Sequence, residues 1–207
     1  MIEYFFMKDQ KINSTNPSGQ KLNELLKYYQ SKRYLDAEKL ALSITKDFPK
    51  HIVAWKVLGI ILKKTGRINE ALLINQKSLE LEPTNIEANF NLGNTLQQLE
   101  RFEEAVLCYR KAISIKPDYI EAYNNLGATL QKIGKFEEAE SCYRKAISIK
   151  SDYTEAYNNL GLTLGAIGRF DKAMSTFIKI IEINPNLQSY LSLVELLTIF
   201  DNKKKVS

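Results

Sequence analysis

A repeat with a fixed period of 34 residues is the feature that most constrains this 207-residue chain. When the sequence is shifted by 34 positions, the segment that starts at Ile86 aligns with the segment that starts at Ile120, and 24 of the 34 aligned residues are identical. The segment from Thr154 continues the register, the segment from Ile52 joins it with fewer matches, and residues 18–51 fit more weakly. A period in this range indicates stacked supersecondary units that bury their apolar faces against one another.

Each unit contains two stretches with helical periodicity. In the segment from Ile120, apolar or small residues recur at steps of three and four between positions 122 and 130, and again between positions 136 and 147, with Gly134 in between. This spacing predicts two amphipathic helices. Proline near the end of most units stops the second helix, because proline lacks the backbone donor that a helix needs. We therefore expect five helix–turn–helix repeats, at residues 18–51, 52–85, 86–119, 120–153 and 154–187.

Small residues indicate where the two helices of a repeat meet. Gly127 lies on the first helix of its repeat, and Ala139 and Ala146 lie on the second. We expect these three residues to leave room for a close approach of the two backbones, so that larger side chains there overpack the contact.

Seven positions of the repeat, numbered 7, 8, 11, 20, 24, 27 and 32, resemble the tetratricopeptide repeat. In the segment from Ile120 they hold Leu126, Gly127, Leu130, Ala139, Tyr143, Ala146 and Ser151. The resemblance is close over residues 52–187 and partial over 18–51. It implies an all-α, right-handed superhelix, a solenoid of about five helix pairs plus a terminal helix, whose first helices line a concave groove. The sequence departs from the family at position 11, where leucine replaces the usual aromatic residue, and at position 32, where Ser151 replaces proline.

The segments outside the repeats are short. We expect a flexible amino-terminal segment at 1–17, a terminal capping helix at 188–200 and a basic tail at 201–207. The first ten residues include Glu3 and lack a cleavage site, which argues against a secretory signal. Residues 191–200 are apolar, but Glu195 interrupts them and they are far shorter than the roughly 20 residues needed to cross a bilayer. These features predict a cytoplasmic protein without a membrane span.

The charge distribution argues against nucleic-acid binding. The formal net charge is +5, and most of it falls on residues 18–85, whereas residues 86–187 mix both signs at helical spacing. Mixed charges of this kind are typical of a solvated helix surface. A nucleic-acid interface would be a continuous basic stripe.

The sequence shows no arrangement typical of catalysis. His51 is the only histidine and is expected at a solvent-facing turn, with no partner nucleophile implied by spacing. Cys108 and Cys142 occupy equivalent positions in adjacent repeats and form no CxxC pair, so we interpret them as packing residues in a reducing compartment. Acidic pairs such as Glu103 and Glu104 fall where second helices start and meet the helix dipole. We expect no catalytic residue, no metal and no cofactor.

Carboxamide side chains dominate the positions of the first helices that packing leaves free, namely 2, 5, 6, 9, 12 and 13. The residues predicted to contact a peptide are Asn91, Asn94, Gln98, Asn124, Asn125, Gln131, Asn158 and Asn159. An amide side chain both donates and accepts, so it can pair with the C=O and the N–H of a peptide backbone. The alternative interpretation is that these amides only solubilise a hydrated helix face.

Three of these residues, Asn91, Asn125 and Asn159, occupy position 6 of successive repeats. This row is similar to the asparagine ladder in the tetratricopeptide arm of O-linked N-acetylglucosamine transferases. Asn23 extends it more weakly, and Val57 interrupts it in the second repeat.

The sequence therefore predicts a non-catalytic adaptor that holds an extended segment of another protein in its groove. Two alternatives stay open at this point. The first is the recognition arm of a glycosyltransferase, or of another group-transfer enzyme, whose catalytic domain is absent from this chain. The second is a scaffold that forms homo-oligomers through the apolar terminal helix around Tyr190, Leu191, Val194 and Leu197.

Overall fold

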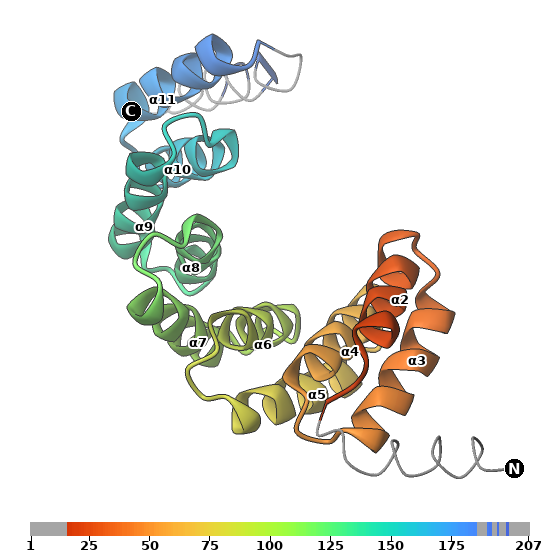
Figure 1. The fold of residues 1–207 in the computed structure, drawn as a ribbon. Helices are drawn as coiled ribbons and strands as arrows, with labels where there is room; N and C mark the ends of the chain where they lie inside the picture. Colours follow the sequence, from red (N-terminus) through yellow and green to blue (C-terminus); the bar gives the residue numbers. More distant parts are fainter. Residues whose placement is uncertain (1–15, 186–189, 192–193, 195–197, 199–207) are drawn as a thin grey trace, which may run out of the picture. The chain divides into compact units, whose positions relative to one another are not determined.

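The computed structural model describes residues 16–185 and, beyond them, positions 190, 191, 194 and 198. Over residues 16–185 it contains ten α-helices and no strand (Figure 1). The first helices of the repeats are α2 (Gly19–Gln30), α4 (Ile52–Lys64), α6 (Ile86–Gln98), α8 (Ile120–Lys132) and α10 (Thr154–Ala166). The second helices are α3 (Tyr34–Asp47), α5 (Ile68–Leu81), α7 (Phe102–Ile115), α9 (Phe136–Ile149) and α11 (Phe170–Ile183).

The fold class predicted from the period, an all-α solenoid of helix pairs, is confirmed. Each predicted repeat contains one first helix and one second helix. The predicted segments 1–17 and 188–200 lie mostly outside the described residues, and the tail at 201–207 lies wholly outside them.

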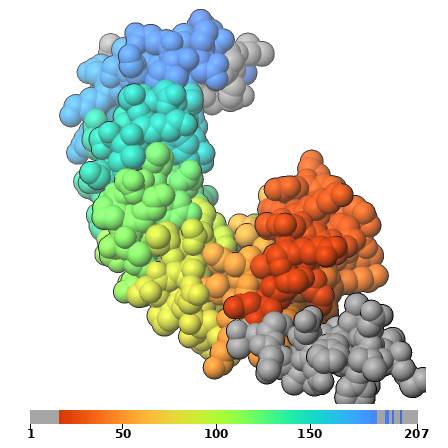
Figure 2. Space-filling view, in the orientation of Figure 1, coloured from red at the N-terminus to blue at the C-terminus, as the bar shows by residue number. Residues whose placement is uncertain are grey.

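The helices group into two compact units, Met1–Leu99 and Glu100–Ser207. The first unit holds α2 to α6 and the second holds α7 to α11, so the third helix pair is divided between them. Within the first unit α4 packs against α3, α5 and α6, and within the second unit α8 packs against α7, α9 and α10. In the space-filling view the helices of the second unit, from green to blue, follow one another in chain order (Figure 2). Both α4 and α8 thus contact the second helices on either side of them in the sequence.

A glycine on the first helix faces a large side chain on the second. A Cβ atom added at Gly127 would lie 2.7 Å from Cε1 of Tyr143, and one added at Gly161 would lie 2.7 Å from Cζ of Phe177. Both aromatic side chains are fully buried. Gly127, Ala139 and Ala146 were expected to leave room for a close approach of the two helices, and the structure shows that the room at Gly127 is filled by the Tyr143 ring.

The first two repeats fill the same contact differently. In the first repeat Leu25 and Ala41 occupy the positions of the glycine and the aromatic residue, and both are fully buried. In this repeat the larger side chain of the pair lies on the first helix, whereas in the later repeats it lies on the second helix. In the second repeat Gly59 faces Asn75, and a Cβ at Gly59 would collide with the Asn75 Oδ1. The first repeat therefore keeps a pair of about the same combined size as glycine and tyrosine, whereas the second repeat has a smaller pair whose amide is hydrogen-bonded to α6.

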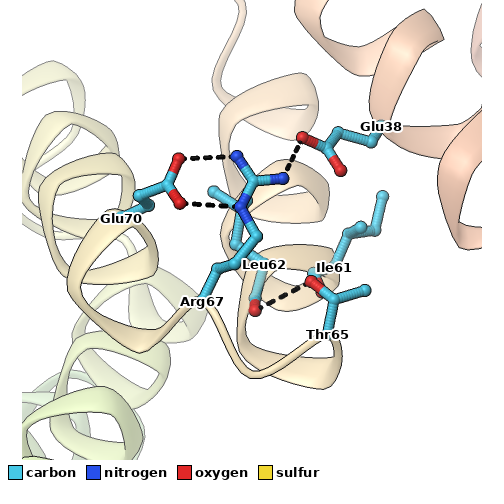
Figure 3. Close-up of polar contacts among 6 residues, drawn as sticks. All are labelled: Glu38, Ile61, Leu62, Thr65, Arg67 and Glu70. Atoms are coloured by element: carbon cyan, nitrogen blue, oxygen red, sulfur yellow. Dashed lines mark hydrogen bonds and ion pairs between the residues drawn. The ribbon is translucent and has the colours of Figure 1, made fainter.

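An arginine at the start of a second helix ties neighbouring repeats together. Arg67 lies between two carboxylates, with Nη1 2.5 Å from Glu38 Oε1 in the preceding repeat and Nη2 2.6 Å from Glu70 Oε2 in its own helix (Figure 3). The hydrogen bond from Arg67 lowers the pKa of Glu70. In the second unit Arg169 contacts Glu140 from the equivalent positions, with Nη1 2.5 Å from Oε2. The same ion pair therefore joins the first two repeats and the last two.

The glycine–aromatic contact gives a direct stability test. Gly127→Ala places a methyl group against the buried Tyr143 ring, so we expect the free energy of unfolding to fall by about 1–3 kcal/mol. Gly19→Ala is the matched control, because a Cβ there meets nothing within 4 Å. Its free energy of unfolding should change by no more than about 0.5 kcal/mol. Urea denaturation followed by circular dichroism measures both, and equal midpoints for the two variants would contradict the packing described here.

Candidate functional site: the carboxamide faces

The predicted peptide-contacting residues lie on α6 in the first unit and on α8 and α10 in the second. We call Asn91, Asn94 and Gln98 the first carboxamide face, and Asn125, Gln131, Asn158 and Asn159 the second carboxamide face. All seven side chains are half-buried or exposed.

Asn124, the eighth predicted residue, is buried. Its side chain is 1% exposed. The Asn124 Nδ2 donates to Glu155 Oε1 at 2.8 Å, and the Asn124 Oδ1 accepts from Asn159 Nδ2 at 3.0 Å. The prediction that Asn124 presents its amide to a peptide does not fit this environment, because position 5 of α8 points at the neighbouring helix α10. Asn124 instead positions the side chain of Asn159.

Asn159 keeps most of its hydrogen-bonding capacity. An asparagine amide has two N–H donors and one carbonyl acceptor with two lone pairs. The bond to Asn124 uses one N–H and fixes the orientation of the amide plane. One N–H and the Oδ1 atom then remain for a ligand. These two groups match the C=O and the N–H of one peptide unit.

A series of hydrogen bonds holds Asn124, and through it Asn159, in place. Glu155 accepts from Asn124 through Oε1 and from the Tyr153 hydroxyl through Oε2, at 3.1 Å. Burial and the Glu155 charge raise the pKa of Tyr153, so this phenol stays protonated and donates. Tyr153, Glu155, Asn124 and Asn159 therefore form one continuous polar network across the contact between α8 and α10.

Buried tyrosines reach the second carboxamide face from the second helices. The Tyr143 hydroxyl donates to Gln131 Oε1 at 3.3 Å, and the Tyr109 hydroxyl is hydrogen-bonded to the side chain of Asn125. Both rings are fully buried, and burial raises the pKa of both phenols. A tyrosine at position 24 thus fills the core with its ring and holds an amide with its hydroxyl.

A threonine four residues after each row asparagine fixes the local backbone. The Oγ1 atoms of Thr95, Thr129 and Thr163 donate to the carbonyl oxygens of Asn91, Asn125 and Asn159 at 3.0, 2.8 and 2.8 Å. All three threonines are fully buried. Sequence reasoning missed this pairing. The signal was present as the repeated pattern Asn-Leu-Gly-X-Thr, because threonine inside a helix commonly bonds back to the carbonyl four residues earlier.

Asn75 holds the first carboxamide face in another way. It lies on α5 at the position where later repeats have an aromatic residue, and it is buried. The Asn75 Nδ2 donates to Thr95 Oγ1 at 2.8 Å and to the Asn91 backbone carbonyl at 3.4 Å. In the preceding helix α4, Val57 is buried where the row would need an asparagine. The first unit therefore presents its carboxamides from α6 without a matching amide at position 6 of α4.

His51 differs from its predicted environment. It precedes α4 as its N-cap residue and is half-buried, and its Nδ1 is buried with no hydrogen-bond partner among the described residues. Sequence reasoning placed it facing solvent, which is wrong, because the turn packs the ring against the protein. Burial lowers the pKa of His51, so the imidazole is neutral at neutral pH. Within the described part of the chain no group of three or more His, Cys, Asp or Glu residues lies together as metal ligands.

Comparison with known families identifies the repeat. Tetratricopeptide-repeat models match residues 75–106, 120–153 and 154–187, and a model described as TPR repeat matches residues 98–134. The chain therefore contains tetratricopeptide repeats, which these matches place between residues 75 and 187. A search of curated proteins finds no significant match. Over the described residues no helix has the length and apolar character required to cross a bilayer.

Solved structures with the same fold include MamA, at 27% identity and a TM-score of 0.72, covering 76% of this chain and 92% of that one. YrrB matches at 20% identity and a TM-score of 0.74, covering 92% of this chain and 97% of that one. TTC0263, a thermophilic TPR protein of Thermus thermophilus, matches at 21% identity and a TM-score of 0.68, covering 86% and 98%. All three likenesses support the repeat fold, and at this identity the last two show the fold alone.

The cysteines give a pH-dependent prediction. Cys108 and Cys142 are free and half-buried, and burial raises the pKa of each thiol from 9.0 to about 11. Because the thiolate is the reactive form, labelling by an aromatic disulfide at pH 8 should be about 100-fold slower in the native protein than in urea. The native rate should then rise about tenfold per pH unit until the pH approaches 11. Equal native and unfolded rates at pH 8 would show that the thiols are not held in this environment.

Proposed function

We propose that the chain is a non-catalytic scaffold or adaptor that binds an extended segment of a partner protein. On the second unit Asn125 and Asn159 contact the backbone of that segment, and Gln131 and Asn158 flank it. On the first unit Asn91, with Asn94 and Gln98 beside it, offers the same kind of contact. The two free cysteines suit a reducing compartment such as the cytoplasm. Tetratricopeptide-repeat architecture supports a protein-interaction role, and the geometry of the carboxamide faces supports these residues as the site.

The Asn159 amide, which is oriented by one hydrogen bond and keeps one N–H and its carbonyl oxygen for a ligand, is the observation that carries this proposal. A purely solubilising amide would need no buried residue to orient it. Asn159 is oriented by Asn124, which is itself anchored on Glu155. Pre-orientation of this kind lowers the entropy lost when a ligand binds. Burying the polar side chain of Asn124 for this purpose is costly unless it is hydrogen-bonded, and here it bonds both Glu155 and Asn159.

The repeat spacing fits an extended ligand. The first helices α8 and α10 are in direct contact, and packed helices lie about 8–10 Å apart. An extended chain advances about 3.3 Å per residue. Amides on successive first helices would therefore meet roughly every third residue of the ligand. Among proteins of this fold, YrrB is described as a TPR protein with an unusual peptide-binding site.

Recognition of the peptide backbone predicts which changes in the protein and in the peptide weaken binding. A peptide selected from a random library against the intact chain should bind the Asn125→Ala/Asn159→Ala double variant at least about tenfold more weakly, since each lost hydrogen bond contributes about 0.5–1.5 kcal/mol. N-methylation of one contacted peptide amide should weaken binding similarly, whereas exchange of most peptide side chains should not. Isothermal titration calorimetry measures all of these affinities.

The matched control is Asn69→Ala/Gln76→Ala, which removes two exposed carboxamides from the second helix α5. It should bind the peptide like the parent protein, and both double variants should keep the parent's circular dichroism spectrum. Unchanged affinity in a folded Asn125→Ala/Asn159→Ala variant would refute backbone recognition by these amides.

Self-association is a second candidate function, favoured by one observation. Tyr190, Leu191 and Val194 are helical and lie 50%, 44% and 56% exposed. Leu197, the fourth residue of the predicted surface, lies outside the described residues. Large apolar side chains exposed at the end of a repeat array are unusual, because terminal repeats normally carry a polar outer face.

Light scattering of the full chain separates the two candidate functions. If the terminal surface joins copies, the mass should rise with concentration toward twice that of the monomer, and Leu191→Glu/Val194→Glu should keep the chain monomeric because a buried carboxylate pair is unfavourable. The control is Leu73→Glu/Leu107→Glu, which places the same charges on exposed leucines of α5 and α7. A parent protein that stays monomeric at every concentration contradicts self-association.

A further inference from the structure

A pocket of about 440 Å³ opens between α9, α10 and α11 in the second unit. Its apolar part consists of Ile147, Leu160 and the ring of Tyr157. Leu160 is buried and the other two are half-buried, so they form the floor. This volume lies in the range of about 300–1,000 Å³ that is typical of ligand sites.

The rim of the pocket is basic. Arg144 on α9 and Lys179 on α11 both line it, and each side chain is 52% exposed. Among the described residues that line the pocket, none is acidic. Arg144 contacts Glu140 Oε1 at 2.8 Å, but Glu140 also pairs with Arg169, so one carboxylate serves two guanidinium groups.

Both rim cations are available to a ligand. Lys179 contacts Glu182 at 2.8 Å within its own helix. Exposed ion pairs of this kind contribute little to stability. Guanidinium and ammonium groups also carry more donors than these contacts use. The rim can therefore bind an added carboxylate without disrupting the fold.

The hydroxyl groups of the pocket indicate what kind of anion fits. The hydroxyls of Ser148, Ser175 and Thr176 donate to backbone carbonyls of their own helices at 2.8, 2.9 and 2.7 Å. Because the hydroxyl hydrogens are used, these oxygens can only accept. They can therefore bind the N–H groups of a ligand but not its anionic oxygens. A bare inorganic anion could use only the two cations. A peptide could use the cations with its carboxylates, the hydroxyl oxygens with its N–H groups and the floor with an apolar side chain.

The same lining recurs one repeat earlier. Of the eight lining positions, seven hold the same residue 34 positions before, and the exception is Cys142 in place of Thr176. Arg110 and Lys145 supply the two cations and Tyr123 supplies the ring. These residues belong to α7, α8 and α9, all within the second unit. In the first unit the equivalent positions include Leu42 and Leu73, which are exposed and apolar.

The pocket and the second carboxamide face use different sides of α10. Tyr157 and Leu160 are three residues apart and share one side of the helix, whereas Asn158 and Asn159 point away from it. A ligand in the pocket would therefore not contact the row of asparagines.

We propose that this pocket is a second peptide-binding site, which takes an acidic segment with an aliphatic or aromatic side chain next to a carboxylate. The carboxylate binds Arg144 and Lys179, the neighbouring side chain covers Leu160, and backbone N–H groups meet the serine and threonine oxygens. The equivalent residues of the preceding repeat, Arg110, Lys145 and Tyr123, offer the same contacts, so a longer acidic segment could bind along both repeats.

Nuclear magnetic resonance titration of the full chain tests the site. The probe is the capped hexapeptide Gly-Glu-Leu-Glu-Leu-Gly, and its counterpart with glutamine at both glutamates is the neutral comparison. We expect the acidic peptide to shift the amide resonances of Tyr157, Ser175 and Lys179 and to bind at least about tenfold more tightly than the neutral one. Equal binding of the two peptides, shifts confined to other helices, or the same shifts from sodium phosphate alone would each overturn the proposal.

Variants then separate local contact from overall charge. Arg144→Gln/Lys179→Gln should weaken the acidic peptide about tenfold or more, whereas Lys39→Gln/Lys50→Gln removes the same charge from exposed positions of the first unit and should leave binding unchanged. Ser148→Trp, which fills the pocket and keeps the charge, should also weaken binding. An equal loss in the Lys39→Gln/Lys50→Gln variant overturns the site. The Asn125→Ala/Asn159→Ala variant should bind this peptide like the parent, so failure of this proposal and failure of the carboxamide row are distinguishable.

Discussion

The packing of a large aromatic side chain on the second helix against a glycine on the first helix sets the geometry on which the rest of this structure depends. Gly127 and Gly161 lack the Cβ that would collide with Tyr143 and Phe177, so the two helices of each of these repeats approach closely around a buried ring. Because protein interiors are close-packed, the size of the ring in this contact fixes the separation of the two helices. It also carries a polar group through the core, since the Tyr143 hydroxyl emerges at Gln131 on the other side.

The same contact explains why the two units present different surfaces. Where a tyrosine fills position 24, its hydroxyl holds an amide of the first helix. Where Asn75 stands in that position, the donor is shorter and bonds the buried hydroxyl of Thr95 and the backbone of Asn91. The first repeat uses Leu25 against Ala41 and has no polar group there at all. A repeat can therefore keep its shape while losing the support for its amide, and the row of asparagines is interrupted in the second repeat without any change of fold.

The 34-residue period was sufficient to predict the helices, because periodic apolar residues and a repeated turn leave few other structures open. It did not predict the roles of Asn124 or His51. A helix position is either exposed or buried depending on what the neighbouring repeat places beside it, and the contact between Asn124 and Asn159 joins residues 35 apart. Similarly, the ring of His51 is half-buried by the turn that it belongs to. The pocket between α9 and α11 was also missed, since its lining comes from three helices and no segment of the sequence carries it alone.

Helix α10 carries both proposed sites, and its packing keeps them at a fixed distance. The Phe177 ring on α11 packs against Gly161, and Asn124 on α8 is hydrogen-bonded to Asn159. These two contacts hold α10 from both sides, so it cannot rotate to favour one site over the other. Two ligand segments could then bind together without competing for the same side chains. For a single partner that supplies both segments, the second binding event is intramolecular and its effective concentration depends on the linker between them. Affinity would then come from the spacing that the repeat imposes, in addition to the contacts of either site.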